Sequence, residues 1–91
     1  MIALRSTSVS NREHLEPHLD WVRKHAAAGT FLFCGSFVER STGGMIVART
    51  ESREALDRIL SEDPFLINGC ATHDVMSFNV SLGAHAHTLA P

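Results

Sequence analysis

The 91-residue sequence lacks tyrosine, has one tryptophan and two cysteines, and contains no apolar run approaching the length of a bilayer-spanning helix. Its cysteines, Cys34 and Cys70, form neither a CxxC pair nor a disulfide-rich pattern, so we expect two reduced and largely buried thiols. Residues 1–8 hold one arginine and no long apolar core, which is atypical of a secretory signal. These absences predict a cytoplasmic protein that contacts no membrane.

Charge is sparse and nearly balanced. Charged residues make up 20% of the chain, and 8 basic against 10 acidic side chains give a formal net charge of -2. Binding to a nucleic-acid backbone requires a stripe of basic residues, whereas only Arg23 and Lys24 are adjacent here. We therefore expect no nucleic-acid partner. The motifs of phosphate-binding loops, dinucleotide-binding folds and serine hydrolases are also missing.

The chain does contain enough apolar material for one folded domain. Hydrophobic residues make up 44% of it, which excludes a segment that is disordered for lack of them. We expect a single domain over residues 1–82, followed by a tail over residues 83–91. A domain of this size buries only about 60–65% of its unfolded-chain surface, so self-association would add useful burial.

The pattern of apolar residues predicts four strands and two helices in the order βαββαβ. The strands are expected at residues 1–8, 31–38, 44–50 and 72–80. This is the element order of a ferredoxin-like fold, in which two helices cover one face of a four-stranded antiparallel sheet. The sequence therefore predicts an α+β domain of that architecture.

The first helix is the clearest predicted element, and Gly29 is a typical signal for its end. Its buried stripe is expected to consist of Leu15, Leu19, Val22 and Ala26. The second helix is expected to begin after a capping residue, Ser52. Pro64 should stop it, because a residue before proline is pushed out of the helical region.

The second predicted strand is apolar on both sides. By simple alternation, one face would hold Phe31, Phe33 and Phe37, and the other Leu32, Cys34 and Val38. Residues 45–48 are also apolar without interruption. Because a sheet with one face in water should alternate with polar residues, we predict a two-fold homodimer in which a second copy covers the open sheet face.

Three side chains of the first helix are expected along one flank, namely His18, Trp21 and His25. His18 lies beside the predicted buried stripe, so it should sit between the core and a cleft. An imidazole has an ordinary pKa of about 6.5, which suits proton transfer near neutral pH. Position alone favours a structural histidine bonded to a carbonyl oxygen, so both interpretations stay open.

Asp63 follows the second predicted helix and precedes Pro64. An Asp-Pro pair usually shapes a turn, with the carboxylate accepting local backbone hydrogen bonds. A carboxylate can also fix the tautomer of a histidine and support its charged form. In a ferredoxin-like fold the two helices lie on one face, so His18 and Asp63 can meet. Ser36, after Gly35 in the second strand, either contacts a substrate oxygen or accompanies a strand irregularity.

A metal site is the weaker interpretation of the histidines. His14 and His18 have the spacing of two ligands on one helical face. If Pro17 is the first helical residue, which is its usual place, then His14 precedes the helix and the pair loses that spacing. We therefore assign no metal ligand.

In their order and spacing, these residues resemble the YciI-like (YCII-related) family of the dimeric α+β barrel group. The resemblance covers most of the chain, from the first helix to the last strand. Its local signals are His18-Leu19 followed by Gly29, then Cys34-Gly35-Ser36-Phe37, then Gly43-Gly44-Met45-Ile46-Val47. Its most specific signal is Asp63-Pro64-Phe65, followed by Gly69 and the final strand.

The resemblance implies a ferredoxin-like fold, a dimer formed through the sheets and an active site carried by His18 and Asp63. Family members often carry an arginine three residues before the histidine. That position is Leu15 here, and Arg12 lies one turn earlier. If the family arginine anchors an anionic substrate, this role is either missing here or taken by Arg12. A characterised branch resembles a cofactor-free dehydrochlorinase acting on a chlorinated hydroxyquinol. Related α+β barrels include muconolactone isomerase-like enzymes and small monooxygenases, although a fold alone does not determine a reaction.

Three functions remain open on the sequence. The first is a small cofactor-independent lyase, isomerase or dehydrochlorinase-type enzyme, in which the His18–Asp63 pair moves a proton on a small carbonyl or phenolic substrate. Trp21, Phe65 and Ser36 would then line its pocket. The second is a non-catalytic dimer that binds a small ligand. The third is a metal-dependent enzyme using His14, His18 and a carboxylate.

Overall fold

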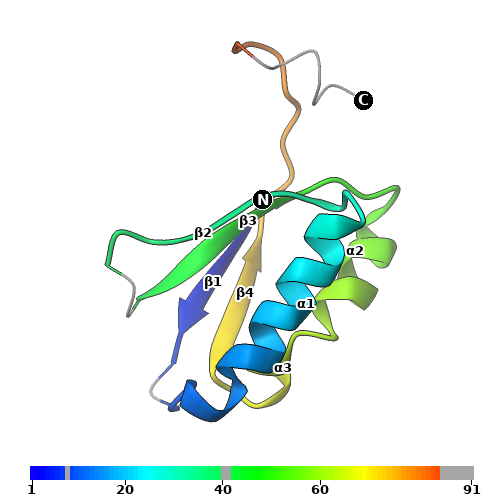
Figure 1. Ribbon diagram of the computed structural model, residues 1–91. Coiled ribbons are helices and arrows are strands. Elements are labelled where there is room, and N and C mark those ends of the chain that lie inside the picture. The colour runs from blue at the N-terminus through cyan, green and yellow to red at the C-terminus, as the bar shows by residue number, and fades with distance from the viewer. Residues whose placement is uncertain (8, 40–41, 85–91) are drawn as a thin grey trace.

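The computed structural model describes residues 1–7, 9–39 and 42–84. Within these described residues, strands and helices follow one another along the chain (Figure 1). In order, they are β1 (Ile2–Ser6), η1 (Arg12–His14), α1 (Leu15–Ala27), β2 (Phe31–Ser36), β3 (Gly43–Ala48), α2 (Arg53–Leu60), α3 (Pro64–Ile67) and β4 (Ala71–Val75). Residues 85–91 of the predicted tail lie outside the described residues.

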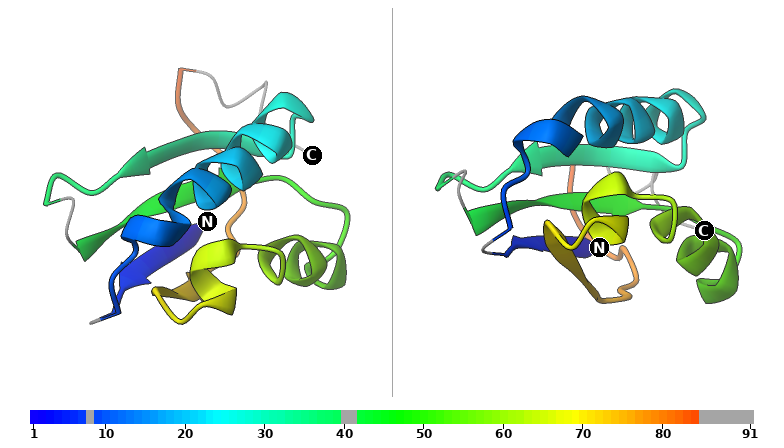
Figure 2. Two further views of the ribbon diagram at one scale, coloured as in Figure 1. Left: turned by 60° about the horizontal axis from the view of Figure 1, so that its bottom comes forward. Right: turned by 90° about the horizontal axis from the view of Figure 1, so that it is seen from below.

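The strands form one sheet in the order β2-β3-β1-β4, and every neighbouring pair is antiparallel. All three α-helices lie on the same face of this sheet, which leaves the other face open (Figures 1 and 2). β1 is one of the two inner strands, and its first three residues, Ile2, Ala3 and Leu4, are all buried. The predicted ferredoxin-like α+β arrangement is therefore confirmed.

The second half of the chain differs from the prediction in two places. α2 begins after Ser52, whose hydroxyl accepts a hydrogen bond from the Ala55 N–H at 3.1 Å, as expected, but it already ends at Leu60. Pro64 does not stop that helix; it opens the short helix α3, where a missing N–H costs nothing. The predicted strand over 72–80 is also too long, because β4 ends at Val75 and the following segment leaves the sheet (Figure 1).

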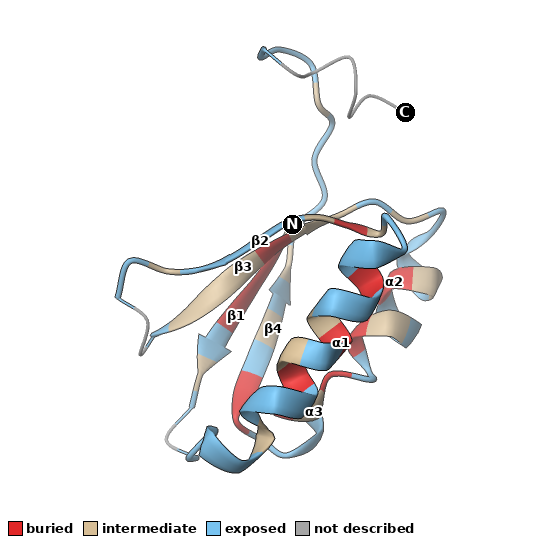
Figure 3. Ribbon diagram, viewed as in Figure 1, coloured by how far each residue is buried: buried red, intermediate tan, exposed pale blue. Residues whose placement is uncertain are grey.

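The buried face of α1 is not the predicted one. Its buried side chains are His18, Trp21 and His25, as the red bands on α1 mark in Figure 3. Of the predicted stripe, Leu15 and Ala26 are exposed, and Leu19 and Val22 are only half-buried. The stripe prediction was wrong because histidine, which sequence patterns count as polar, can be buried when a carboxylate accepts its N–H.

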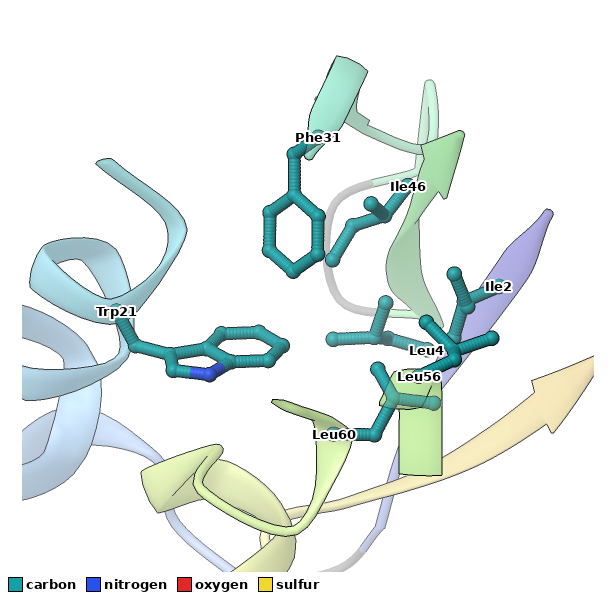
Figure 4. Close-up of a cluster of buried hydrophobic side chains, with 7 residues drawn as sticks. All are labelled: Ile2, Leu4, Trp21, Phe31, Ile46, Leu56 and Leu60. Atoms are coloured by element: carbon teal, nitrogen blue, oxygen red, sulfur yellow. The ribbon is translucent and has the colours of Figure 1, made fainter. Parts of the chain in front are cut away.

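The hydrophobic core lies between the sheet and the helices. Trp21 of α1 meets Phe31 of β2 edge-on, with ring centroids 5.1 Å apart, and its indole N–H donates to the Ile59 carbonyl at 3.0 Å (Figure 4). The remaining members of this cluster are Ile2, Leu4, Ile46, Leu56 and Leu60. Trp21 therefore joins α1, α2 and the sheet in one packed unit, which fixes α1 relative to the strands.

β2 contains one residue more than the stretch of β3 with which it pairs. Phe31 pairs with Ala48 and Phe33 with Val47, so the register shifts between these two phenylalanines. Phe31 is buried in the core, whereas Phe33 is 59% exposed on the opposite face. The prediction that they share a face was wrong for this reason. Beyond the shift, Cys34 pairs with the core residue Ile46 and so returns to the helix side.

Candidate active site

A cleft of about 310 Å³ lies between α1 and the helix-facing side of β1, β2 and β3. Leu15, Leu19 and Val22 of α1 form one wall. The strands form the other wall with Cys34, Gly35, Ser36 and the start of β3. Gly43 begins β3 with a φ of +127°, and a Cβ there would lie 1.8 Å from the Leu4 carbonyl oxygen, so only glycine fits. The cleft volume is typical of a small-molecule site.

His18 lines this cleft, although its side chain is only 11% exposed. Its Nδ1 lies 2.6 Å from Oδ1 of Asp63. The Phe65 ring stacks on the imidazole, with centroids 3.9 Å apart and planes 5° from parallel. Because Nδ1 is bonded to the carboxylate and the ring plane is fixed by stacking, Nε2 is the nitrogen left for a molecule in the cleft.

Asp63 is completely buried and occupies the N-cap of α3. Its Oδ1 accepts hydrogen bonds from His18 and from the Phe65 N–H at 2.9 Å. Its Oδ2 accepts a hydrogen bond from Nε2 of His73 at 2.8 Å. Both interpretations of Asp63 therefore hold at once, because the same carboxylate caps a turn and pairs with His18.

The surroundings of Asp63 keep it ionised. Burial alone raises the pKa of this carboxyl group, because it disfavours the charged form. The hydrogen bonds from His18 and His73, the charge of His18 and the Phe65 N–H act in the opposite direction and outweigh burial. The pKa of Asp63 is accordingly lowered to about 2. An acceptor that is charged at neutral pH thus lies behind His18.

His73 is the residue that sequence reasoning missed. It lies on β4, and its side chain is only 7% exposed. Its ring is nearly parallel to that of Trp21, with planes 8° apart and centroids 6.3 Å apart. A signal was present, because His73 alternates with the buried Ala71 and so points to the helix side of the sheet. Alternation alone could not show that it reaches Asp63.

The other predicted site residues fall in different places. Phe65 and Ser36 both line the cleft. Trp21 does not; it packs behind His18, with ring centroids 5.7 Å apart, as part of the core. Arg12 is exposed in η1 and is also absent from the cleft wall, whereas Leu15 contributes to it. The structure therefore brings together His18, Asp63, Phe65 and Ser36.

The two cysteines and His14 were further candidates for chemistry at this site. Cys70 is buried as expected, but Cys34 is exposed and lines the cleft. Partial burial raises the pKa of the Cys34 thiol, which favours its protonated, weakly nucleophilic form. His14 precedes α1 as its N-cap residue. Within the described residues, no three or more His, Cys, Asp and Glu side chains are grouped to hold a metal ion.

None of the helices in the described part of the chain has the length and apolar character needed to cross a membrane.

Comparisons with known proteins identify the family. The comparisons with curated proteins and with solved structures found no match. The family model of the YCII-related domain, in contrast, matches residues 3–79, which include the sheet except Ile2, the described helices and the His18–Asp63–His73 cluster. The chain therefore belongs to the YCII-related family.

Proposed function

We propose that the protein is a small acid–base enzyme of the lyase or isomerase type, in which His18 moves a proton on a small carbonyl or phenolic substrate. The observation that carries this proposal is the position of His18 on the cleft wall with its Nδ1 on a buried, ionised Asp63. A carboxylate behind an imidazole fixes the Nδ1–H tautomer and stabilises the imidazolium that forms when Nε2 takes a proton. This step needs no cofactor.

The proposed reaction moves one proton and one bonding pair of electrons. Nε2 of His18 takes a proton from an acidic C–H or O–H group of the substrate, whose bonding electrons stay behind as an enolate or phenolate. In an elimination, these electrons expel a leaving group such as chloride from a saturated carbon, and the imidazolium then gives its proton to water. A chlorinated phenol first takes a proton on its chlorine-bearing ring carbon, which makes that carbon saturated. In an isomerisation, the imidazolium returns the proton to another atom. Positioned proton transfer of this kind contributes about 10²- to 10⁴-fold to a rate.

The walls of the cleft favour a neutral, largely apolar substrate. Leu15, Leu19 and Val22 face it from α1, and Phe65 closes the end beside His18. Among the described residues that line the cleft there is no Lys, Arg, Asp or Glu. Ser36 supplies a hydroxyl for a substrate oxygen. An anionic group would find no fixed counter-charge among these described lining residues, and Arg12 is not one of them, so we do not assign it an anion-binding role.

The function can be tested without knowing the natural substrate. The protein is incubated in D₂O with a panel of cyclic enones and chlorinated dihydroxybenzenes, and NMR follows both C–H exchange and changes in the protein spectrum. We expect at least one compound to perturb the signals of Phe65 and Ser36 and to undergo catalysed C–H exchange or chloride release. Binding at these residues without any turnover across the panel would support a ligand-binding protein instead.

We also propose that two copies pack through the open sheet face. The strand alternation that directs Ile46 into the core directs Met45 and Val47 to the opposite face, next to Phe33. These two side chains are half-buried, and Phe33 is largely exposed. This apolar part of the face, which lies on the same side of the sheet as the Arg5–Asp74 ion pair, is costly to leave in water, and a second copy covers it with a self-complementary surface.

The dimer predicts a specific mutational effect. Sedimentation at micromolar concentration should give twice the mass of one chain, and Phe33→Asp should weaken association about 100-fold or more, because it buries an unpaired charge. Ile67→Asp is the matched control, since Ile67 on α3 is similarly exposed, at 66% against 59%, but lies on the helix side. A monomeric wild-type protein, or a Phe33→Asp variant that still dimerises, would contradict the proposal.

A further inference from the structure

His73 is the most unusual buried group in the described part of the chain. Its Nε2 is bonded to Asp63, but its Nδ1 is inaccessible to solvent and has no hydrogen-bond partner among the described residues. Buried polar atoms without partners are rare, and each has a cost. The function proposed above uses only His18 and Asp63, so a second buried imidazole on the same carboxylate requires its own explanation.

The geometry limits the protonation of His73. Asp63 is ionised and can only accept, so Nε2 of His73 carries a hydrogen. A second proton would have to sit on Nδ1, where it would form a buried N–H of a cation with no acceptor. Such an uncompensated charged donor costs more than a neutral nitrogen with an unused lone pair. His73 therefore favours the neutral form with hydrogen on Nε2.

His18 faces the opposite situation on the same carboxylate. Its Nδ1 donates to Asp63, while the ring borders an open cleft in which an Nε2–H can reach water or a substrate. A buried carboxylate also favours one compensating positive charge near it. Of the two histidines, only His18 can carry that charge without leaving a donor unpaired.

The other ionisable groups near His73 are occupied elsewhere. On α1, His25 donates to Glu62 at 3.0 Å, so this pair satisfies itself. On β1, the residue opposite His73 is Leu4, which is apolar. Next to His73 on β4, Asp74 pairs with Arg5 at 3.8 Å, and alternation directs both to the opposite face of the sheet. Asp63, with His18 beyond it, is the ionisable partner left for His73.

We propose that His73 is a positioning residue that acts through Asp63: as a permanently neutral Nε2–H donor, it occupies Oδ2 of the carboxylate and confines the exchangeable proton of the cluster to His18. Sharing the carboxylate between two donors also weakens its hold on the His18 imidazolium. The effect on turnover rests on the function proposed above, whereas the assignment of protonation states does not.

The first test is an NMR titration of ¹⁵N-labelled histidine side chains in the wild-type protein between pH 5 and 8. We expect His73 to keep the nitrogen shifts of a neutral ring protonated at Nε2 throughout, because its buried Nδ1 has no acceptor among the described residues. A titration of His73 over the same range would overturn the proposal, whether or not any substrate is turned over.

The second test compares His73→Gln with His73→Leu. The glutamine amide can still donate to Oδ2, so we expect the midpoint of the His18 titration to stay close to the wild-type value. Leucine removes the donor, while the Phe65 N–H and the turn still hold Asp63 in place. The unshared carboxylate should then bind the His18 imidazolium more strongly and move the midpoint above the wild-type value.

The outcomes separate the two proposals. A His73→Leu midpoint that equals or falls below the wild-type value refutes the role of His73. If leucine prevents folding, the wild-type tautomer and the glutamine midpoint still decide the question, because a clear shift in His73→Gln contradicts a role as a simple donor. Failure of the proposed function has a different signature, namely no C–H exchange or chloride release by wild-type protein whose histidines titrate as expected.

Discussion

Replacing Asp63 with asparagine is expected to lower the free energy of unfolding by about 2 to 4 kcal/mol. The asparagine oxygen can still accept from the Phe65 N–H and from one histidine. Its amide nitrogen, however, would face the second histidine, so that two donors confront each other in a fully buried site. The negative charge that compensates an imidazolium is lost as well. Few single substitutions in this chain disturb as many buried partners.

Urea denaturation at pH 7 measures this loss, with Asp57→Asn as the control. Asp57 is 57% exposed and pairs with Arg53 at 2.8 Å on the surface of α2, so its replacement should cost less than about 1 kcal/mol. Equal effects of the two substitutions would show that the hydrogen bonds to Asp63 contribute little to stability.

The difference between wild type and Asp63→Asn should also depend on pH. The pKa of Asp63 is lowered from 3.8 to about 2 in the folded protein, so the carboxylate stabilises the fold fully above pH 3.8. This contribution is lost as the pH falls through the folded value, and it amounts to about 2 kcal/mol. Denaturation curves of the two proteins should therefore converge between about pH 4 and pH 2, whereas a constant difference would contradict the lowered pKa.

Replacing His18 with glutamine is expected to reduce catalysed exchange or chloride release by about 10²- to 10⁴-fold. Glutamine can fill much of the same space and donate to Asp63, but it has no nitrogen that takes up a proton near neutral pH. Ligand binding should change only a few-fold, because the apolar walls of the cleft remain. The substitution should therefore lower the rate of turnover and leave the affinity for the ligand nearly unchanged.

His14→Gln is the matched control for this substitution. His14 lies one turn before His18, at the N-cap of α1, and does not line the cleft. Its replacement should leave turnover within about two-fold of wild type, as is usual for changes outside a site. If His14→Gln and His18→Gln lower the rate equally, the loss reflects damage to the start of α1 and the assigned role of His18 is wrong.

Much of the fold could be predicted from the sequence, because local signals and tertiary packing agree there. Ser52 caps α2 and Gly29 follows α1 with a φ of +83°, as their residue types indicate. The order of strands and helices then determines a ferredoxin-like sheet. Element ends were less predictable, since Val75 ends β4 although the following residues continue to alternate between polar and apolar.

The pairing at the site could be predicted only through the family resemblance, and one member was missed. His18 and Asp63 lie far apart in sequence, and nothing local to either residue reveals their contact. His73 was missed because strand alternation indicates the face on which a histidine lies but not whether it reaches a buried carboxylate. The buried face of α1 was misjudged for the same reason, since its histidines are buried only because acidic residues elsewhere in the chain accept their N–H groups.

The irregularity in β2 has a consequence for how this strand can vary. Phe31 lies in the core, Phe33 lies on the open face of the sheet, and Cys34 lines the cleft. Three nearby positions of one strand therefore lie in three different environments. Phe33 does not line the cleft, so a substitution there can alter the proposed dimer face without changing a cleft residue, whereas a substitution of Cys34 changes the cleft. Anyone who aligns relatives of this chain by strict alternation will assign the residues after the extra position to the wrong side of the sheet.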